Sequence, residues 1–215
     1  MLGPPAATLA HTMAGWALGL CLGYVAVVFG VRSVLRRRTA GSTGWVRGFG
    51  ATPAERVANA LFLSSCALDL LAPALVLAGA LRPIAALDRA ALHALGFLVF
   101  AAAVGGASSA QSTMGAAWRT GIDPSAPPVL VTAGLFRLAR HPVYTTMVTS
   151  SLGVALLVPT VLAAMTVPMC LIALEIQTRL VEEPFLIQRH GRAYLDYART
   201  VGRFLPRLGR IRPQE

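Results

Sequence analysis

The stretch that decides the fold is residues 143–178, VYTTMVTSSLGVALLVPTVLAAMTVPMCLIALEIQT. It is apolar almost throughout. It is too long for one membrane helix of about 20 residues and too short for two full spans with a long loop between them. Pro159 lies near its middle, and proline disfavours a continuous helix because it lacks a backbone N–H and clashes with the preceding turn. We therefore expect two short helices that meet at Pro159 and form a hairpin.

Basic residues flank this hairpin on both sides. Arg137 and Arg140 precede it, and Arg179 follows it. Arginine concentrates on the cytoplasmic side of membrane proteins, so both ends of the hairpin are expected at that face. The hairpin would then bring the polar residues before position 143 and after position 178 to one membrane surface.

The composition agrees with a membrane protein. Of the 215 residues, 55% are hydrophobic and 13% are charged, whereas an ordinary soluble domain has about 25% charged residues. This balance argues against a soluble globular protein and against a disordered chain. The 19 basic residues are all arginines, and they cluster at the ends of apolar runs, as a topology signal does, so we expect no nucleic-acid partner. The three cysteines match no metal or disulfide spacing, and we expect no metal site.

Three more apolar runs precede the hairpin, at residues 14–31, 57–81 and 90–110. The last is rich in glycine and alanine, which permit close helix packing. Arg32 and residues 36–38 follow the first run and no basic residue precedes it, which predicts the N-terminus outside.

The expected fold is therefore an all-α integral membrane protein with about five transmembrane helices. It has a single domain, with three spans in residues 1–110 and a working half in residues 111–206. The apolar and arginine residues of the segment 184–206 predict a cytoplasmic interfacial helix and a cytoplasmic C-terminus. An arginine-only, alanine-rich chain favours a bacterial source and hence the inner (plasma) membrane. The oligomeric state stays open.

A first polar cluster, RLARHPVY, occupies residues 137–144. Pro142 suits the first turn of a helix, where its missing N–H costs nothing. Arg140 and His141 then stand just before that helix and Tyr144 in its first turn, beside backbone N–H groups that lack intrahelical partners. Such a corner can bind an anionic or polar group. The same residues also fit a positive-inside anchor with an interfacial tyrosine.

A second cluster comprises Glu175, Arg179, Glu182 and Glu183, whose spacing places them on one helix face. Glu175 and Arg179 can form an ion pair. The two adjacent glutamates precede Pro184, which we take as the helix end, where the helix dipole and their mutual repulsion oppose them. We expect a cationic partner for them, such as Arg140, Arg179 or a bound cation. A solvated helix end is the alternative.

Asp69 lies near the middle of the second apolar run, where a charge costs about 3 kcal/mol. It is expected to be neutral, paired or facing a polar cavity, and we take it as a candidate substrate-binding residue. Trp118 and Arg119 lie in the proline- and glycine-rich loop of residues 111–142 and are further candidates, because such long loops are often functional.

Residues 134–144, GLFRLARHPVY, resemble the G-x-[YF]-R-x-x-R-[HN]-P-x-Y signature of isoprenylcysteine carboxyl methyltransferases and related phospholipid methyltransferases. The sequence of residues 182–206, with EEPFL, HG, two tyrosines and V-x-x-F-x-P in order, is similar to the second half of that pattern. The resemblance covers about residues 111–206.

The resemblance implies a membrane enzyme that uses S-adenosylmethionine, with a lipophilic molecule or lipid as methyl acceptor at the cytoplasmic face. It implies that His141, Tyr144, Glu182 and Glu183 line the cofactor pocket, with backbone contacts near Val131 and Gly134. The full set of expected cofactor-binding residues is Val131, Gly134, Phe136, Arg140, His141, Pro142, Tyr144, Arg179, Glu182 and Glu183.

The acceptor group decides which further residues the reaction needs. A carboxylate needs no base, and Arg119, Arg199 or Arg203 could orient it. An amine, thiol or phenol needs a base, for which Glu175 or Glu183 are the first candidates. Two other functions fit the sequence as well: an NADPH-dependent membrane reductase of sterol-like or enone lipids, and a non-enzymatic lipid-binding membrane protein.

Overall fold

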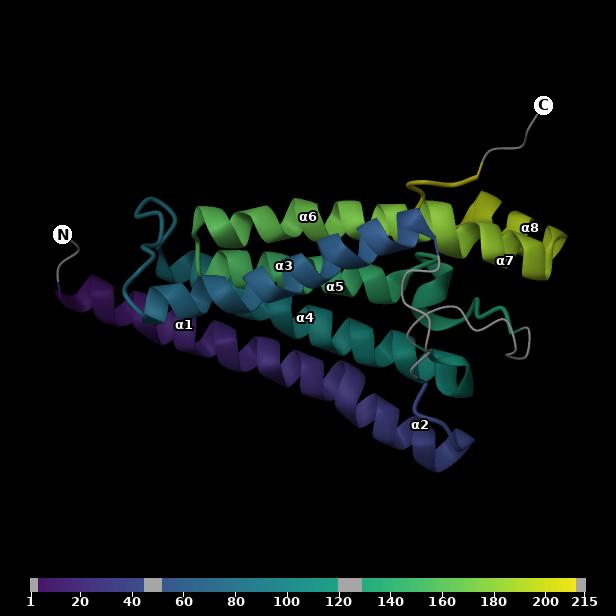
Figure 1. The fold of residues 1–215 in the computed structure, drawn as a ribbon, viewed down its shortest axis with the longest axis horizontal. Helices are drawn as coiled ribbons and strands as arrows, with labels where there is room; N and C mark the ends of the chain where they lie inside the picture. Colours follow the sequence, from purple (N-terminus) through teal and green to yellow (C-terminus); the bar gives the residue numbers. More distant parts are fainter. Residues whose placement is uncertain (1–3, 45–51, 120–128, 212–215) are drawn as a thin grey trace.

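The computed structural model describes residues 4–44, 52–119 and 129–211, and the regular structure in these ranges is helical (Figure 1). The first long helix comprises α1 (Pro4–Val25), a π-helical turn η1 (Ala26–Val31) and α2 (Arg32–Ala40). It is followed by α3 (Pro53–Leu77), α4 (Ala90–Met114), the short 3-10 turns η2 (Gly115–Ala117) and η3 (Gly134–Arg137), and α5 (Pro142–Leu157). The chain then forms α6 (Val161–Gln177), a second π-helical turn η4 (Thr178–Glu182), α7 (Glu183–His190) and α8 (Arg192–Thr200).

Within the described residues, four helical stretches are long and apolar enough to cross a membrane: Leu9–Thr39, Pro53–Leu77, Ala90–Ala117 and Val161–His190. α5 is apolar but has only 16 residues, about 24 Å at 1.5 Å per residue, which is less than the usual hydrocarbon thickness. The predicted all-helical membrane fold is confirmed. The expectation of about five spans becomes four long helices and one short helix.

The predicted hairpin is present, with a break at residues 158–160 between α5 and α6. The Thr160 hydroxyl caps α6 by accepting a hydrogen bond from the Ala163 N–H at 3.1 Å. The Pro159 carbonyl accepts from the Ile84 N–H at 2.7 Å, which ties the hairpin turn to the α3–α4 connection.

The expectation that both arms are short is wrong for the second arm, and Pro184 does not end its helix. The helical stretch from Val161 to His190 has 30 residues. The π-helical turn η4 lies directly before Pro184, which stands at the start of α7. Within a regular α-helix, proline lacks the N–H for the i→i−4 hydrogen bond, and its ring clashes with the carbonyl of residue i−4. The different hydrogen-bond register of a π turn removes both problems. The separate amphipathic helix is thus α8, not the whole segment 184–206.

Glycines let α5 pack closely on α4. A Cβ at Gly153 would lie 2.9 Å from the Phe100 Cβ, and one at Gly106 would lie 2.8 Å from the Thr146 Cγ2. Real Cβ atoms do not approach so closely, so both positions depend on the absence of a side chain. The glycine-rich composition of the third run therefore serves helix packing, as expected.

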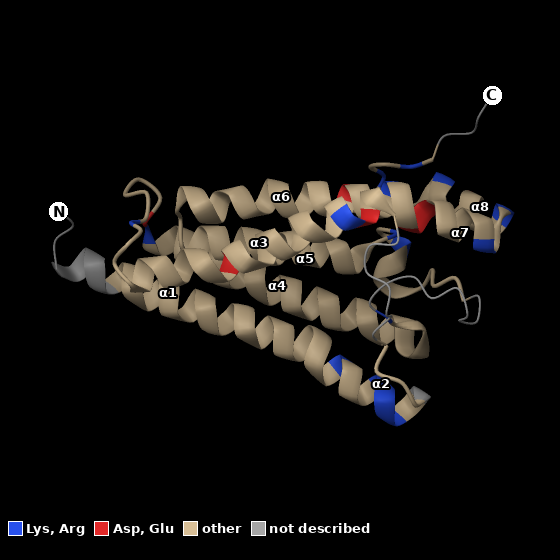
Figure 2. Ribbon diagram, in the orientation of Figure 1, with Lys and Arg blue, Asp and Glu red and all other residues tan. Residues whose placement is uncertain are grey.

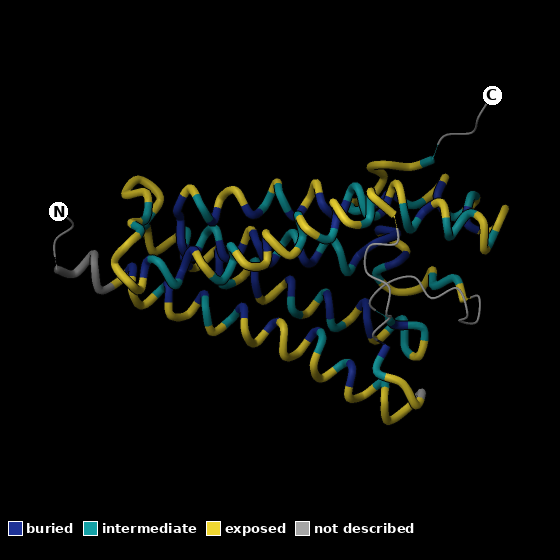
Figure 3. Tube along the Cα trace, viewed as in Figure 1, coloured by how far each residue is buried: buried dark blue, intermediate teal, exposed yellow. Residues whose placement is uncertain are grey.

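The chain runs back and forth so that its polar segments meet at one end of the bundle. Figure 1 shows the start of α1, the α3–α4 connection and the α5–α6 turn at one end, and α2, α7 and α8 at the other. Figure 2 shows that most basic residues lie at this second end. Figure 3 shows exposed residues along the outer sides of the helices, where Leu98 and Val161 are 69% and 64% exposed, as suits contact with lipid.

Candidate active site

The candidate site begins where the C-terminal segment pairs with the residues before α5. The Arg140 N–H donates to the Gly202 carbonyl at 2.8 Å, and the His141 N–H donates to the Arg203 carbonyl at 3.0 Å. A Cβ at Gly202 would lie 2.0 Å from the Leu205 carbonyl oxygen, so this crossing requires glycine. The pairing fixes the backbone of both halves of the sequence pattern against each other.

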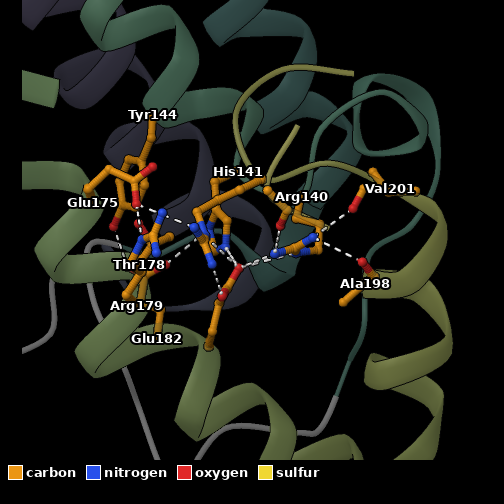
Figure 4. A network of polar contacts seen from close by, with 12 residues as sticks. Arg140, His141, Tyr144, Glu175, Thr178, Arg179, Glu182, Ala198 and Val201 are labelled. Carbon is orange, nitrogen blue, oxygen red and sulfur yellow. Dashed lines mark hydrogen bonds and ion pairs between the residues drawn. The ribbon is translucent and has the colours of Figure 1, made fainter. Parts of the chain in front are cut away.

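A buried arginine joins these two segments to α7. The Arg140 side chain is buried, and its guanidinium donates to a Glu183 carboxylate oxygen. It also donates to the Ala198 and Val201 carbonyls at 3.2 Å and 2.6 Å, as Figure 4 shows, and to the Gly209 carbonyl at 3.1 Å. With protein partners on every side, Arg140 acts as a structural centre of this corner.

Arg203 completes the neutralisation of Glu183. Its guanidinium donates to the Glu183 Oε2 at 2.8 Å and to the Glu175 Oε2 at 3.3 Å. The hydrogen bonds to Glu183 raise the pKa of Arg203 above its usual value. Glu183 is therefore held between two arginines. Arg140 was one of the cationic partners expected for the glutamate pair, and Arg203 was not among them.

Glu182, the neighbouring residue, shares His141 with Glu183 and is also bound by Tyr144. The Tyr144 hydroxyl donates to one of its carboxylate oxygens, and the His141 Nδ1 lies 3.3 Å from the other. The His141 and Tyr144 rings are stacked, with centroids 5.8 Å apart (Figure 4). Burial lowers the pKa of His141, but hydrogen bonds and charge interactions with Glu182 and Glu183 outweigh burial and raise the pKa overall. These residues form a compact polar corner.

This corner opens into a large cavity of about 790 Å³. Apolar residues of the first long helix, α3, α5 and α6 line one part of the cavity, and polar and aromatic residues of α7 and α8 line the part beside Glu182. The apolar part is lined by residues such as Val25, Phe29, Phe62, Met147 and Leu174. A cavity of this size accommodates a cofactor together with part of a second, apolar molecule.

Most residues expected from the sequence to bind cofactor or substrate lie in the cavity wall. They are Trp118, Arg119, Val131, Phe136, Arg140, His141, Pro142, Tyr144 and Glu182. The wall does not include Gly134, Arg179, Glu183, Glu175, Arg199, Arg203 or Asp69. Gly134 still supports the wall, because it has a positive φ of 56° and a Cβ there would lie 2.8 Å from the Thr113 Oγ1.

The remaining expected residues have other contacts. Glu175 pairs with Arg179 on one side, as the spacing predicted, and with Arg203 on the other. Arg199 is exposed and pairs with Asp196. Asp69 lies outside the cavity wall. Its carboxylate accepts a hydrogen bond from the Ser151 hydroxyl at 2.6 Å between α3 and α5, which fits the paired state that the sequence also allowed.

The cavity wall also contains polar residues that the sequence did not single out as binding residues. They are Ser33, Glu55, Asn59, Gln111, Gln177, Arg189, His190, Tyr194 and Tyr197. Tyr197 donates from its hydroxyl to the Phe136 carbonyl at 2.6 Å, and burial raises its pKa to about 12. The sequence does contain a pattern that could have indicated two of these residues. Glu55 and Asn59 are polar, stand four positions apart and so share one face at the start of an apolar helix.

The sequence of this region is similar to that of a known protein family. Residues 91–193 match the phospholipid methyltransferase family model. The matched segment is thus similar to the phospholipid methyltransferases over just under half of the chain. Its polar corner combines residues 137–144 and 182–183, so the family segment contains both halves of that corner.

One solved structure is similar over the whole chain. It is the eukaryotic intramembrane Ras methyltransferase, isoprenylcysteine carboxyl methyltransferase, which matches with a TM-score of 0.58 at 18% identity. The match covers 99% of this chain and 71% of that one, and it shows a shared membrane fold. No curated protein matches the chain. Together, the family model and the shared fold support membrane methyltransferase activity.

Proposed function

We propose that this protein transfers a methyl group from S-adenosylmethionine to a lipophilic acceptor at the cytoplasmic face of the membrane. The observation that carries the proposal is one continuous cavity that joins the Glu182–His141–Tyr144 corner to an apolar chamber between membrane helices. A charged cofactor and an apolar acceptor need these two environments side by side. The end with α2, α7 and α8 is proposed to be cytoplasmic, the N-terminus to lie outside and the membrane to be a bacterial inner membrane.

The residues of the corner fit such a cofactor. A carboxylate offers about four acceptor positions, and Tyr144 and His141 use two of those of Glu182. The others can accept from an ammonium group or from ribose hydroxyls, and the negative charge favours a cation. Phe185, Tyr194 and Tyr197 supply aromatic wall for a flat heterocycle.

When bound, S-adenosylmethionine would supply a methyl group on a positively charged sulfur: a nucleophile would attack the methyl carbon in line, and the sulfur would leave with the bonding electrons as S-adenosylhomocysteine. The protein has to position the two partners and exclude water. Arg140 and Arg203 hold Glu183 and thereby fix the start of α7, which keeps Glu182 directed at the cavity. The apolar chamber holds the acceptor chain against this corner.

The geometry changes the residues that we propose for the acceptor. Glu175 and Glu183 lie outside the wall, whereas Glu55 and Glu182 line it, so the latter two are proposed as bases for a protic acceptor. For an acidic acceptor, Arg119 is proposed because it lines the wall, whereas Arg203 lies outside it.

The test is ligand-dependent thermal stability of the purified full chain in detergent. A ligand that binds only the folded state raises the melting temperature, so S-adenosylmethionine and S-adenosylhomocysteine should raise it and NADPH should not. Stabilisation by NADPH alone would favour the membrane reductase. Stabilisation by neither, with lipid binding retained, would favour the non-enzymatic alternative.

A further inference from the structure

Two amide side chains in the cavity wall have buried polar atoms without a hydrogen-bond partner. They belong to Asn59 on α3 and Gln177 at the end of α6. The Asn59 Nδ2 and the Gln177 Oε1 are shielded from solvent, and neither is hydrogen bonded within the described parts of the chain. Buried polar groups are nearly always paired in folded proteins, with protein, water or ligand, so these two atoms in one wall are positions at which a molecule in the cavity can form hydrogen bonds.

The helices place both amides at a similar depth. Phe62 packs against a buried cluster that contains Leu174. Asn59 lies about one turn before Phe62 on α3, and Gln177 lies about one turn after Leu174 on α6. Because α3 and α6 run in opposite directions (Figure 1), both steps lead toward the polar end of the bundle. The two amides thus stand between the apolar chamber and the Glu182 corner.

We propose that Asn59 and Gln177 together bind an uncharged group of the methyl acceptor that both donates and accepts hydrogen bonds, namely a hydroxyl or an amide. The proposal rests on the proposed function, since it places the acceptor in this cavity. An acceptor whose apolar chain fills the chamber and whose reactive end reaches Glu182 has to pass the two amides. The acceptor class is therefore a hydroxylated or amide-bearing apolar lipid.

The chemistry of the two atoms excludes other groups. The Asn59 Nδ2 is a donor and the Gln177 Oε1 is an acceptor, so the pair needs one partner atom that accepts and one that donates. An ionised carboxylate has no donor for Gln177, and a hydrocarbon has neither. A site built for a hydroxyl or amide rejects the analogue that lacks it, because its own buried groups would then stay unpaired.

The experiment measures the affinity of the full chain in detergent for four probes with the same prenyl skeleton: farnesol, farnesoic amide, farnesoic acid and farnesene. Isothermal titration calorimetry is performed with and without S-adenosylhomocysteine. In the parent protein, farnesol or farnesoic amide should bind about tenfold or more tightly than farnesene and more tightly than farnesoic acid, as expected for buried hydrogen bonds.

The variants Asn59→Leu and Gln177→Met should each reduce the preference of the polar probe over farnesene about fivefold or more, at unchanged affinity for S-adenosylhomocysteine. Gln188→Met is the matched control, because Gln188 is exposed on α7 and outside the cavity wall, and it should keep the parent preference. Circular dichroism and S-adenosylhomocysteine binding show that each variant is folded.

Three results would overturn the proposal: equal affinity of the parent for farnesene and the polar probes, tightest binding of farnesoic acid, or a preference unchanged in both variants. Failure of the proposed function gives a different result. The parent would then not bind S-adenosylhomocysteine. The preference for the polar probes over farnesene, measured without S-adenosylhomocysteine, would still show whether Asn59 and Gln177 bind a polar group.

Discussion

Replacing Glu183 by glutamine should damage the fold, whereas the same change at Glu182 should damage the site. Glu183 is buried and accepts hydrogen bonds from both Arg140 and Arg203. Glu183→Gln removes one negative charge and leaves two buried guanidinium groups short of a partner. Breaking a buried ion pair in this way costs about 3–5 kcal/mol. For a chain of this size that loss corresponds to a melting temperature lower by about 6–20 °C.

Glu182→Gln should behave differently. Its partners are the Tyr144 hydroxyl and His141 rather than an arginine, and a glutamine oxygen can still accept from the tyrosine. We expect a stability within about 1 kcal/mol of the parent. The variant loses charge-assisted hydrogen bonds to the cofactor, at about 1.5–3 kcal/mol, so the affinity for S-adenosylhomocysteine should fall about 10- to 150-fold.

The assay combines thermal unfolding in one detergent with calorimetric binding of S-adenosylhomocysteine, for both variants and the parent. Asp196→Asn is the control, because it removes the exposed pair with Arg199, which contributes little to stability. The reasoning would be refuted if Glu183→Gln melted within about 2 °C of the parent, or if Glu182→Gln kept the parent's affinity.

Three further predictions concern the surroundings of the site. Gly202→Ala should lower the free energy of unfolding by about 2 kcal/mol or more, because the new Cβ meets the Leu205 carbonyl, and chemical denaturation in detergent checks it. The interactions of protonated His141 with Glu182 and Glu183 raise its pKa in the folded state. They contribute fully to stability below about pH 6.5, and this contribution is lost as the pH rises through the folded-state pKa. As the pH is raised from about 6.5 through this pKa, the melting temperature of His141→Gln should therefore fall less than that of the parent. Asp69→Asn keeps an oxygen for the Ser151 hydroxyl, so the affinity for S-adenosylhomocysteine should stay within about twofold, and a larger loss would place Asp69 at the site.

The sequence predicted the parts of the fold that depend on hydrophobic length and charge. A break at Pro159 and arginines on both flanks were enough to predict a hairpin that brings residues 137–144 and 182–183 together. The structure confirms that these segments meet. This success has a simple cause, because span length and basic flanks are one-dimensional properties that a sequence displays directly.

The errors have an equally physical cause. Proline usually ends a helix, so the sequence predicts a helix end at Pro184, but the π-helical turn η4 accommodates this proline inside a longer helix. For Asp69 the sequence predicts either a polar partner or a cavity, and only the packing of α5 against α3 supplies the partner, Ser151. Asn59 and Gln177 were missed because only the packing of α3 against α6 puts them in one wall.

The adjacent glutamates show why such a pair is difficult to interpret from sequence. Successive residues of a helix point about 100° apart, so Glu182 and Glu183 direct their carboxylates to different sides, although His141 lies within reach of both. In the structure, Glu183 turns to the buried arginines and Glu182 to the cavity. The arginines neutralise one carboxylate and anchor the backbone, and the other carboxylate, only one residue away, is thereby held rigidly at the wall. We infer that Glu183 supports the site and that Glu182 binds the cofactor. Glu183→Gln should therefore mainly lower stability, and Glu182→Gln should mainly lower cofactor affinity.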